Sequence, residues 1–407
     1  MRSSHLGLAL GLPLSNAWLD TGHVLVAQIA KMHLSPQEVQ KAERILATWS
    51  GDFPGMSDFV NSAVWPDHIK CIRNDTLYCR GLPATALNEF NAWHFVDVDF
   101  TPDHLALDER NPYEDPSAVW ALAQAMRTFY SSRSNFALNL MLRFALHIVG
   151  DVHQPLHSAE GVFNDTRFGR VRADRGGNLI RIQSNWSTLT NLHAFWDAAG
   201  GMYLDEWPYS SSQEARRDRN ASVIVGDFPK SSLEEYQAED MDCFLIPSDC
   251  MKVFKRWVQE AHLVAVQHAY VGVRAGAPVS DTYVAEVRQI SRKQLALAGY
   301  RLADLVRVAT WRIEVTQAMF GLLPNVRGPS SLAVTSSRSH ELCQARRACE
   351  LSAGRSGDCL QPGVSAACSL SSRAVQKMLC SVPKPPVRVR GWKSSAVCLM
   401  VFPLASC

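Results

Sequence analysis

One stretch of the chain, ALHIVGDVHQPLH, places histidine and aspartate in an almost wholly apolar sequence. His147 and Asp151 are four residues apart, so their side chains lie on the same face if the segment is helical. His157 follows a Gln-Pro step, where the chain must turn. Burying an imidazole or a carboxylate costs free energy unless the group is paired or binds a metal ion. The stretch therefore predicts a buried polar site with a compensating partner.

A second pair with the same spacing, His193 and Asp197, lies in the segment HAFWD, and Asp67, His94 and His23 are further candidates. Imidazole nitrogen and carboxylate oxygen together form a ligand set that zinc prefers. A single His-x-x-x-Asp pair is more often a surface hydrogen bond or a satisfied pair in the core. Two such pairs, with further His and Asp, exceed the needs of one tetrahedral ion, so we predict a site for several metal ions.

Helices must position most of these residues. The segment 135–151, which carries the first pair, has helical length and apolar repeats, and it ends before Pro155 because proline disfavours a helical residue before it. The strand signal is sparse, and residues 178–183 are its best candidate. The fold class expected is all-α (mainly α). Further helical stretches are predicted at residues 22–32, 36–49, 118–130, 250–273 and 281–308.

Charge is distributed unevenly along the 407 residues, although 41 Lys and Arg against 39 Asp and Glu give a formal net charge of only +2. From Trp311 onward there are 12 basic and 4 acidic residues, which leaves a net charge of −6 on the first 310 residues. An acidic body is unusual for a protein that binds polyanions, unless bound cations reverse the local field.

The N-terminus, MRSSHLGLALGLPLSNA, has the features of a secretory signal peptide: Arg2, a short apolar run and a small-residue cleavage site that ends at Ala17. The alternative is a buried N-terminal segment. We predict a protein of the secretory pathway, secreted or at the cell surface, and a glycoprotein. Four glycosylation sequons agree with this, at Asn74, Asn164, Asn185 and Asn220.

Eleven cysteines are present, and those of the body are even in number and close in sequence, as expected for disulfides in a secreted protein. Local pairing would join Cys71 with Cys79 and Cys243 with Cys250, although four cysteines allow three pairings. We predict a signal peptide over residues 1–17, a catalytic domain over 18–310, and a basic, cysteine-rich, disordered tail over 311–407.

No apolar run in the sequence is long enough to predict a transmembrane helix, and the apolar end of the tail, residues 396–407, is too short to span a bilayer. A lipid-anchor signal at this end is an alternative to a plain tail.

The order of several motifs resembles that of a known family. The segments WLDTGH, SAVWPDHIK, WHFVDVD, LHIVGDVHQPLH, GGNLI and NLHAFWD occur in the order found in the zinc-dependent single-strand nucleases of the S-one/P-one type, also called class I nucleases or 3'-nucleotidase/nucleases. The resemblance covers roughly residues 18–310. It implies a mostly helical fold, shared with bacterial zinc phospholipase C, that holds three zinc ions in a cleft.

The resemblance also implies a ligand for each ion. Trp18 would bind one ion of a close pair through its free amine and carbonyl oxygen, together with His23, and Asp151 would bridge that pair. The other ion of the pair would be held by Asp67, His94 and His147. The third ion would be held by His157, His193 and Asp197. Zinc would then compensate the buried His147 and Asp151, and its binding would help the domain to fold.

Further roles follow from the same resemblance. Asp67, Asp151 and Lys70 would be catalytic, with Lys70 contacting the phosphate where fungal relatives carry an arginine. Phe95 would stack on a base and Asp97 would accept hydrogen bonds from base edges, which would favour unpaired strands. The alternatives are a solvated surface lysine for Lys70 and core packing for Phe95.

The function expected is metal-assisted hydrolysis of RNA and single-stranded DNA to 5'-phosphate products, with 3'-nucleotidase activity. RNA, single-stranded DNA and 3'-nucleotides are the expected partners, as substrates, and no stable protein partner is inferred. Two alternatives remain open: a phospholipase C on the same metal scaffold, and a zinc-binding protein without catalytic activity.

Overall fold

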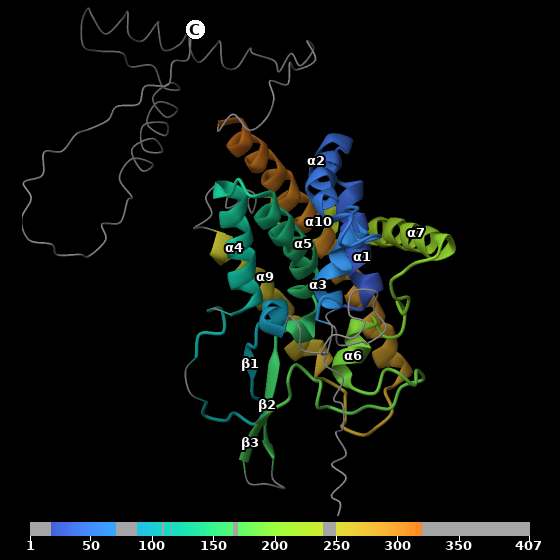
Figure 1. The fold of residues 1–407 in the computed structure, drawn as a ribbon. Coiled ribbons are helices and arrows are strands. Elements are labelled where there is room, and N and C mark those ends of the chain that lie inside the picture. The colour runs from blue at the N-terminus through green and yellow to red at the C-terminus, as the bar shows by residue number, and fades with distance from the viewer. Residues whose placement is uncertain are drawn as a thin grey trace, which may run out of the picture. The chain divides into compact units, whose positions relative to one another are not determined.

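Helices dominate the protein, for which we use a computed structural model that describes residues 18–70, 88–107, 110–114, 116–165, 170–238 and 250–319 (Figure 1). These residues belong to one compact unit, residues 1–325, and residues 326–407, the rest of the chain, lie outside the described part. The expectation of a mainly α fold is confirmed. None of the described helices is long and apolar enough to cross a membrane.

The helices follow one another along the chain with short 3₁₀ turns between them. The α-helices are α1 (Asp20–Met32), α2 (Pro36–Leu46), α3 (Trp65–His68), α4 (Ala118–Ser131), α5 (Asn135–Asp151), α6 (Leu192–Asp197), α7 (Ser211–Asp227), α9 (Cys250–Val264) and α10 (Asp281–Met319). The 3₁₀ turns are η1 (Ala47–Trp49), η2 (Asn61–Val64), η3 (Asn88–His94), η4 (Pro155–His157) and η5 (Lys230–Ser232), and η6 (Ala265–Ala269) is a π-helical turn.

The helix starts use the side-chain caps that their sequences provide. Ser35 caps α2 in a reciprocal capping box with Glu38, and Pro36 stands at the first helical position. Ser117 and Ser134 accept hydrogen bonds from the backbone in the first turns of α4 and α5. These caps fix where each helix begins, and therefore which residues of α5 reach the candidate site.

Helix α5 runs through the middle of the bundle, in contact with α1, α2, α4 and α10 (Figure 1). From Met141 to Asp151 every residue of α5 is buried. Its one basic residue, Arg143, donates hydrogen bonds to the carbonyl of Leu46 and to the side chain of Asn139, and lies over the ring of Trp49. The helix that carries His147 and Asp151 is thus held rigidly from all sides.

A small sheet lies at one end of the bundle. Strand β1 (Asp99–Phe100) pairs in parallel with β2 (Glu160–Asp165), which pairs antiparallel with β3 (Arg170–Ala173). The strand expected at residues 178–183 is wrong, since the segment makes only isolated bridges from Arg181 to Asn191 and from Gln183 to Pro278. Its apolar side chains, such as the buried Ile182, pack into a second hydrophobic cluster without a strand neighbour.

Three helical segments differ from the prediction. Helix α7 was not predicted, because only Ala221 and Ile224 among its residues are buried and the apolar repeat is therefore weak. The stretch 250–273 is divided, since α9 ends at Val264 and the π turn η6 follows. Helix α10 continues to Met319, beyond the end at Val308 that the sequence indicated. The domain limits remain predictions, and the tail beyond Met319 lies outside the described residues.

Candidate metal centre

Eight described residues bring His and Asp side chains into three buried groups, and within each group the candidate ligand atoms lie within 4.8 Å of one another. They come from the start of α1, from α3, η3, α5, η4 and α6, so segments far apart in the sequence converge at one end of the bundle. His147 belongs to two groups. The three groups are His23, His147 and Asp151; Asp67, His94 and His147; and His157, His193 and Asp197.

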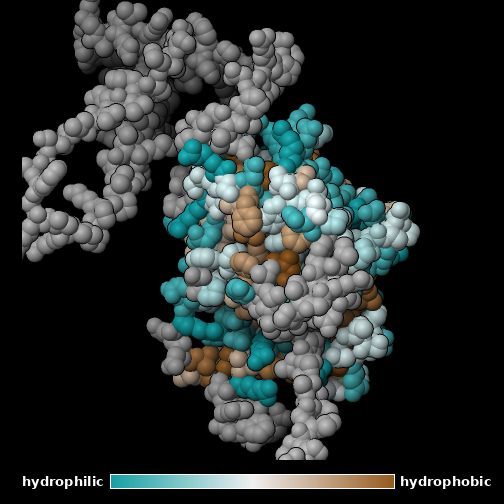
Figure 2. All heavy atoms as spheres, in the orientation of Figure 1, coloured by the Kyte–Doolittle hydropathy of each residue, from teal (hydrophilic) through white to brown (hydrophobic). Residues whose placement is uncertain are grey.

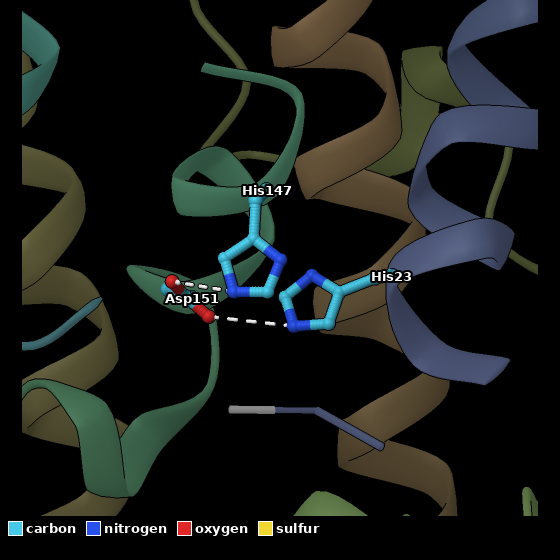
Figure 3. Close-up of side chains that lie close together, drawn as sticks. All are labelled: His23, His147 and Asp151. Carbon is cyan, nitrogen blue, oxygen red and sulfur yellow. Dashed lines mark ion pairs between the residues drawn. The ribbon is translucent and has the colours of Figure 1, made fainter. Parts of the chain in front are cut away.

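Asp151 lies between the first two groups. Its Oδ1 is 3.5 Å from His23 Nε2, and its Oδ2 is 3.3 Å from His147 Nε2, as the dashed lines in Figure 3 indicate. Oδ2 is also 3.2 Å from His94 Nδ1, in the second group. The rings of His23 and His147 stack with centroids 3.7 Å apart. One carboxylate therefore points one oxygen at each of two neighbouring sites, as a bridging ligand does.

The third group places two imidazole nitrogens against each other. His157 Nε2 and His193 Nε2 are 3.0 Å apart, while each ring's Nδ1 lies within 2.7 Å of a backbone carbonyl oxygen. A carbonyl only accepts, so both Nδ1 atoms carry the proton and both Nε2 atoms present bare lone pairs. Two nitrogens on one tetrahedral zinc ion are about 3.3 Å apart. The two Nε2 lone pairs repel each other when both rings are neutral and no cation is bound. A cation that binds both nitrogens makes the same arrangement favourable.

Backbone carbonyls orient three of the histidines. His147 Nδ1 donates to the carbonyl of Ala63 at 2.6 Å, and His193 Nδ1 donates to that of Gly176 at 2.6 Å. His157 Nδ1 donates to the carbonyl of His94 at 2.7 Å, which ties the third group to the second. Hydrogen bonds of this kind fix the tautomer and the ring direction of metal-binding histidines. The Nε2 atom of each ring is thereby directed at the other candidate ligand atoms of its metal group.

Several polar atoms of the centre are buried without a hydrogen-bond partner among the described residues. They include both ring nitrogens of His23, His94 Nε2, Asp67 Oδ2 and both oxygens of Asp151. Such atoms are rare in folded proteins, because each loses its water without replacement. Their concentration here fits metal ligands, since a cation would satisfy all of them together.

Burial keeps the imidazoles in the neutral form that binds metals. It lowers the pKa of His147 and of His193 to about 4, and it lowers the pKa of His23 well below the ordinary value with help from His147. Burial raises the pKa of Asp151, where Asp67 adds like charge, and it also raises the pKa of Asp197. Two carboxylates that resist ionisation without a counter-charge again indicate a cation site.

Lys70 is buried, with only 1% of its surface exposed, and its Nζ donates to Asp67 Oδ1 at 2.7 Å. The alternative of a solvated surface lysine is therefore wrong. Burial by itself would raise the pKa of Asp67. The positive charge of Lys70, with the nearby histidines, lowers it by more, so the pKa lies well below its ordinary value. Asp67 thus stays ionised, with one oxygen on the ammonium group and the other unpartnered.

Phe95 and Asp97 follow His94 and are both half-buried. Among the described residues, Phe95 belongs to neither hydrophobic core cluster, and its backbone carbonyl holds the amide of Ala118. Burial raises the pKa of Asp97 to about 7, and Glu160 adds to the rise. Both residues thus adjoin His94 of the second metal group along the chain, and their roles toward a base stay predictions.

Trp18 is fully buried, and its indole Nε1 donates to the carbonyl of Gly150 at 2.9 Å. Two glycines permit this packing. A Cβ on Gly22 would stand 2.5 Å from Trp18 Cβ, and a Cβ on Gly150 would stand 3.0 Å from His23 Nδ1. The start of the described chain is thereby fixed against α5, next to the first group. Residues 1–17, with the predicted signal peptide, lie outside the described residues.

Sequence reasoning missed Gln154, whose side chain positions Asp197 of the third group by a hydrogen bond. Its Nε2 donates to Asp197 Oδ1 at 2.5 Å, and its Oε1 accepts from the amide of Leu156. The motif HQPLH contained this residue, but only the proline and the histidine were interpreted. The backbone carbonyls of Ala63 and Gly176 were also missed, because no side-chain pattern marks a carbonyl that a distant loop supplies.

The disulfide predictions lie largely outside the described residues, which omit Cys71, Cys79 and Cys243. Cys250 is buried at the start of α9. The pairings therefore stay predictions.

Comparison with known proteins decides the family. A family model described as S1/P1 nuclease matches residues 18–309. The chain belongs to the S1/P1 nuclease family. Endonuclease 3 of Arabidopsis thaliana is 27% identical over 302 residues, covering 70% of this chain and 86% of that protein. Nuclease P1 of Penicillium citrinum and Nuclease S1 of Aspergillus oryzae are each 24% identical, covering 71% of this chain and 96% and 91% of their own lengths.

We predict that removing metal destabilises the folded chain. Dialysis against a strong chelator should lower the melting temperature, because the lone pairs and carboxylates of the centre lose the cation that balances them and metal binds only the folded state. Differential scanning calorimetry would measure the change, and added zinc should reverse it.

A matched pair of variants makes this prediction specific. His193→Ala should lower the zinc content by about one ion per chain, whereas His268→Ala, on a half-exposed histidine paired with Glu286, should leave it unchanged. A melting temperature that ignores both chelator and zinc would contradict a metal centre.

Proposed function

We propose that this chain is a zinc-dependent endonuclease that hydrolyses RNA and single-stranded DNA to 5'-phosphate products and also acts as a 3'-nucleotidase. The observation that carries the proposal is the set of three buried His and Asp groups, two of which share His147 and the bridging Asp151. Membership of a nuclease family gives the reaction class, phosphodiester hydrolysis. Imidazole and carboxylate ligands favour zinc among the common divalent ions.

Three zinc ions would be held by the residues already described. His23 and Asp151, with the amine and carbonyl oxygen of Trp18, would hold the first ion; Asp67, His94 and His147 the second; and His157, His193 and Asp197 the third. When bound, such ions lower the pKa of water and neutralise charge on a phosphate group. Asp67 and Asp151 would act as catalytic residues by holding the ions of the close pair.

The remaining side chains act on the substrate directly. Lys70, buried beside Asp67, supplies a point charge to a phosphate oxygen as charge builds in the transition state. Phe95 stacks on one base, and the Asp97 carboxylate accepts hydrogen bonds from its edge. A stacked base must be unpaired, which accounts for a preference for single strands.

The protein is secreted or held at the cell surface, since a signal peptide and four sequons agree on the secretory pathway. This compartment also allows the disulfides and glycans expected from the sequence.

Parallel assays separate this function from its rivals. The zinc-loaded protein should hydrolyse RNA and single-stranded DNA, leave phosphatidylcholine intact, and lose activity with a chelator. Hydrolysis of phosphatidylcholine alone would indicate a phospholipase C, and full zinc content without any hydrolysis would indicate a binding protein.

Phe95→Ala should weaken transition-state binding by about 1–3 kcal/mol through lost stacking. We expect kcat/KM on a dinucleotide to fall accordingly, while the zinc content measured by mass spectrometry stays normal. An unchanged rate would assign Phe95 to packing.

Asp97 should make substrate binding depend on pH. Because burial raises its pKa to about 7, the carboxylate that accepts hydrogen bonds exists above this pH and is lost as pH falls through it. KM for a 3'-nucleotide should therefore rise as pH falls through about 7, and Asp97→Asn should remove that rise. Identical KM profiles in the two proteins would exclude Asp97 as the acceptor.

Signal cleavage after Ala17 should create a metal ligand. Before cleavage the nitrogen of Trp18 is an amide, which binds zinc poorly, and afterwards it is an amine with a free lone pair. A protein with one extra residue before Trp18 should lose activity by orders of magnitude and keep the other two ions. Full activity with full zinc content would rule out the N-terminal ligand.

A further inference from the structure

A pocket of about 670 Å³ lies between the small sheet and the π turn η6, outside the three metal groups. We name it the aromatic pocket, because Phe100 from β1, Phe163 from β2 and Tyr270 after η6 line it. The ring of Tyr270 lies 5.1 Å from that of Phe100 and 6.3 Å from that of Phe163. A pocket of this size accommodates a planar heterocycle with its attached sugar.

Core packing explains the ring of Tyr270, which packs against the second hydrophobic cluster, but not the other two aromatic rings. Among the described residues, Phe100 and Phe163 belong to neither hydrophobic cluster, and both are half-buried. Val271, which also lines the pocket, is 57% exposed. In Figure 2 a band of apolar side chains crosses the lower part of the molecule, at the level of the strands in Figure 1. Contiguous exposed apolar surface of this kind commonly marks a binding site.

The pocket shares a wall with the third metal group. Leu192 lines the pocket and directly precedes His193. Asp174 also lines it, two residues before Gly176, whose carbonyl holds His193 Nδ1. On the other side, β1 begins two residues after Asp97. Short segments thus carry both the lining of the pocket and the ligands of the third metal group, as a subsite for one continuous strand requires.

The polar groups around the pocket fit a nucleotide. Arg172 is an exposed lining residue, so a guanidinium group stands beside the aromatic rings. Aromatic surfaces next to basic groups are the usual means by which proteins hold single-stranded nucleic acid, since every base has a face that can stack.

We propose that the aromatic pocket binds a second nucleobase of the substrate strand, distinct from the base at Phe95 and Asp97. The inference rests on the proposed nuclease function and extends it to a subsite for longer substrates. Stacking against Phe163 and Phe100 supplies the binding energy, and the subsite favours oligonucleotides over 3'-nucleotides.

A quaternary ammonium headgroup is the occupant that a phospholipase would require, and the contacts disfavour it. Aromatic rings attract such a cation, but the guanidinium group of Arg172 beside these rings repels it. The carboxyl group of Asp174, which also lines the pocket, already accepts hydrogen bonds from the amide of Gly161 at 2.8 Å and from the hydroxyl of Tyr270 at 3.5 Å.

An abasic scan tests the proposal in the zinc-loaded enzyme. The substrates are short oligonucleotides with one cleavable phosphodiester and a single abasic site moved along the strand. In the natural protein, loss of the base that fills the aromatic pocket should lower kcat/KM about tenfold. In Phe163→Ala the same abasic site should have almost no further effect, because the stacking partner is already absent.

Two controls make the result specific. Phe136→Ala removes an aromatic ring that is 64% exposed on α5 and should keep the natural abasic profile. Phe163→Trp should restore sensitivity at the affected position. All proteins are compared after removal of any glycan at Asn164, which lies at the pocket.

The outcomes are distinguishable. An abasic profile in Phe163→Ala identical to the natural one overturns the second-base subsite while leaving the nuclease function intact. Inhibition by phosphocholine that Phe163→Ala abolishes would overturn it in favour of a headgroup site. Absence of any phosphodiester hydrolysis by the natural protein would instead contradict the proposed function itself.

Discussion

The mutual repulsion of buried lone pairs and carboxylates is the constraint on which the rest of the structure depends. His157 and His193 face each other through nitrogens 3.0 Å apart, and neither can relieve the contact by donating a proton. Asp151 has two buried oxygens without a hydrogen-bond partner among the described residues. Such an arrangement costs folding free energy in the absence of a cation. The bundle must be stable enough to hold these groups together until one binds.

The fold keeps these groups together by placing the candidate ligands on rigid elements and by orienting their rings with hydrogen bonds to backbone carbonyls. Helix α5 is buried around His147 and Asp151, and its neighbours leave those side chains little freedom. Backbone carbonyls from η2, η3 and a glycine turn then fix the three ring directions, because Nδ1 must donate to them. Gly176 has a φ of 59°, in the left-handed region, and a Cβ there would stand 2.4 Å from the carbonyl oxygen of Leu156. A glycine is therefore required where the carbonyl turns toward His193.

The sequence predicted the parts of this centre that depend on local periodicity. The four-residue spacing of His147 and Asp151, and of His193 and Asp197, is a property of one helical turn and could be read directly. His23, Asp67 and His94 were candidate ligands by residue type, but only the family resemblance assigned them to particular ions, because that assignment depends on tertiary packing between distant segments. Spacing rules could not predict the β2–β3 hairpin, whose strands have only 6 and 4 residues, or α7, whose buried face has only two residues.

The charge of the centre resolves the contradiction between an acidic body and an anionic substrate. In the ionised form that binds metal, the carboxylates of Asp67, Asp151 and Asp197, together with the ammonium group of Lys70, carry two net negative charges. Three divalent ions would reverse that sign, so an acidic protein presents a cationic site to a phosphodiester. Lys70 contributes a positive charge to this site both without and with bound metal. Before metal binds, it keeps Asp67 ionised, and afterwards the same buried ammonium adds to a positive field that only an anion can offset. On the proposed function, the site would bind cations first and a phosphate second, and Lys70 would contribute to both steps.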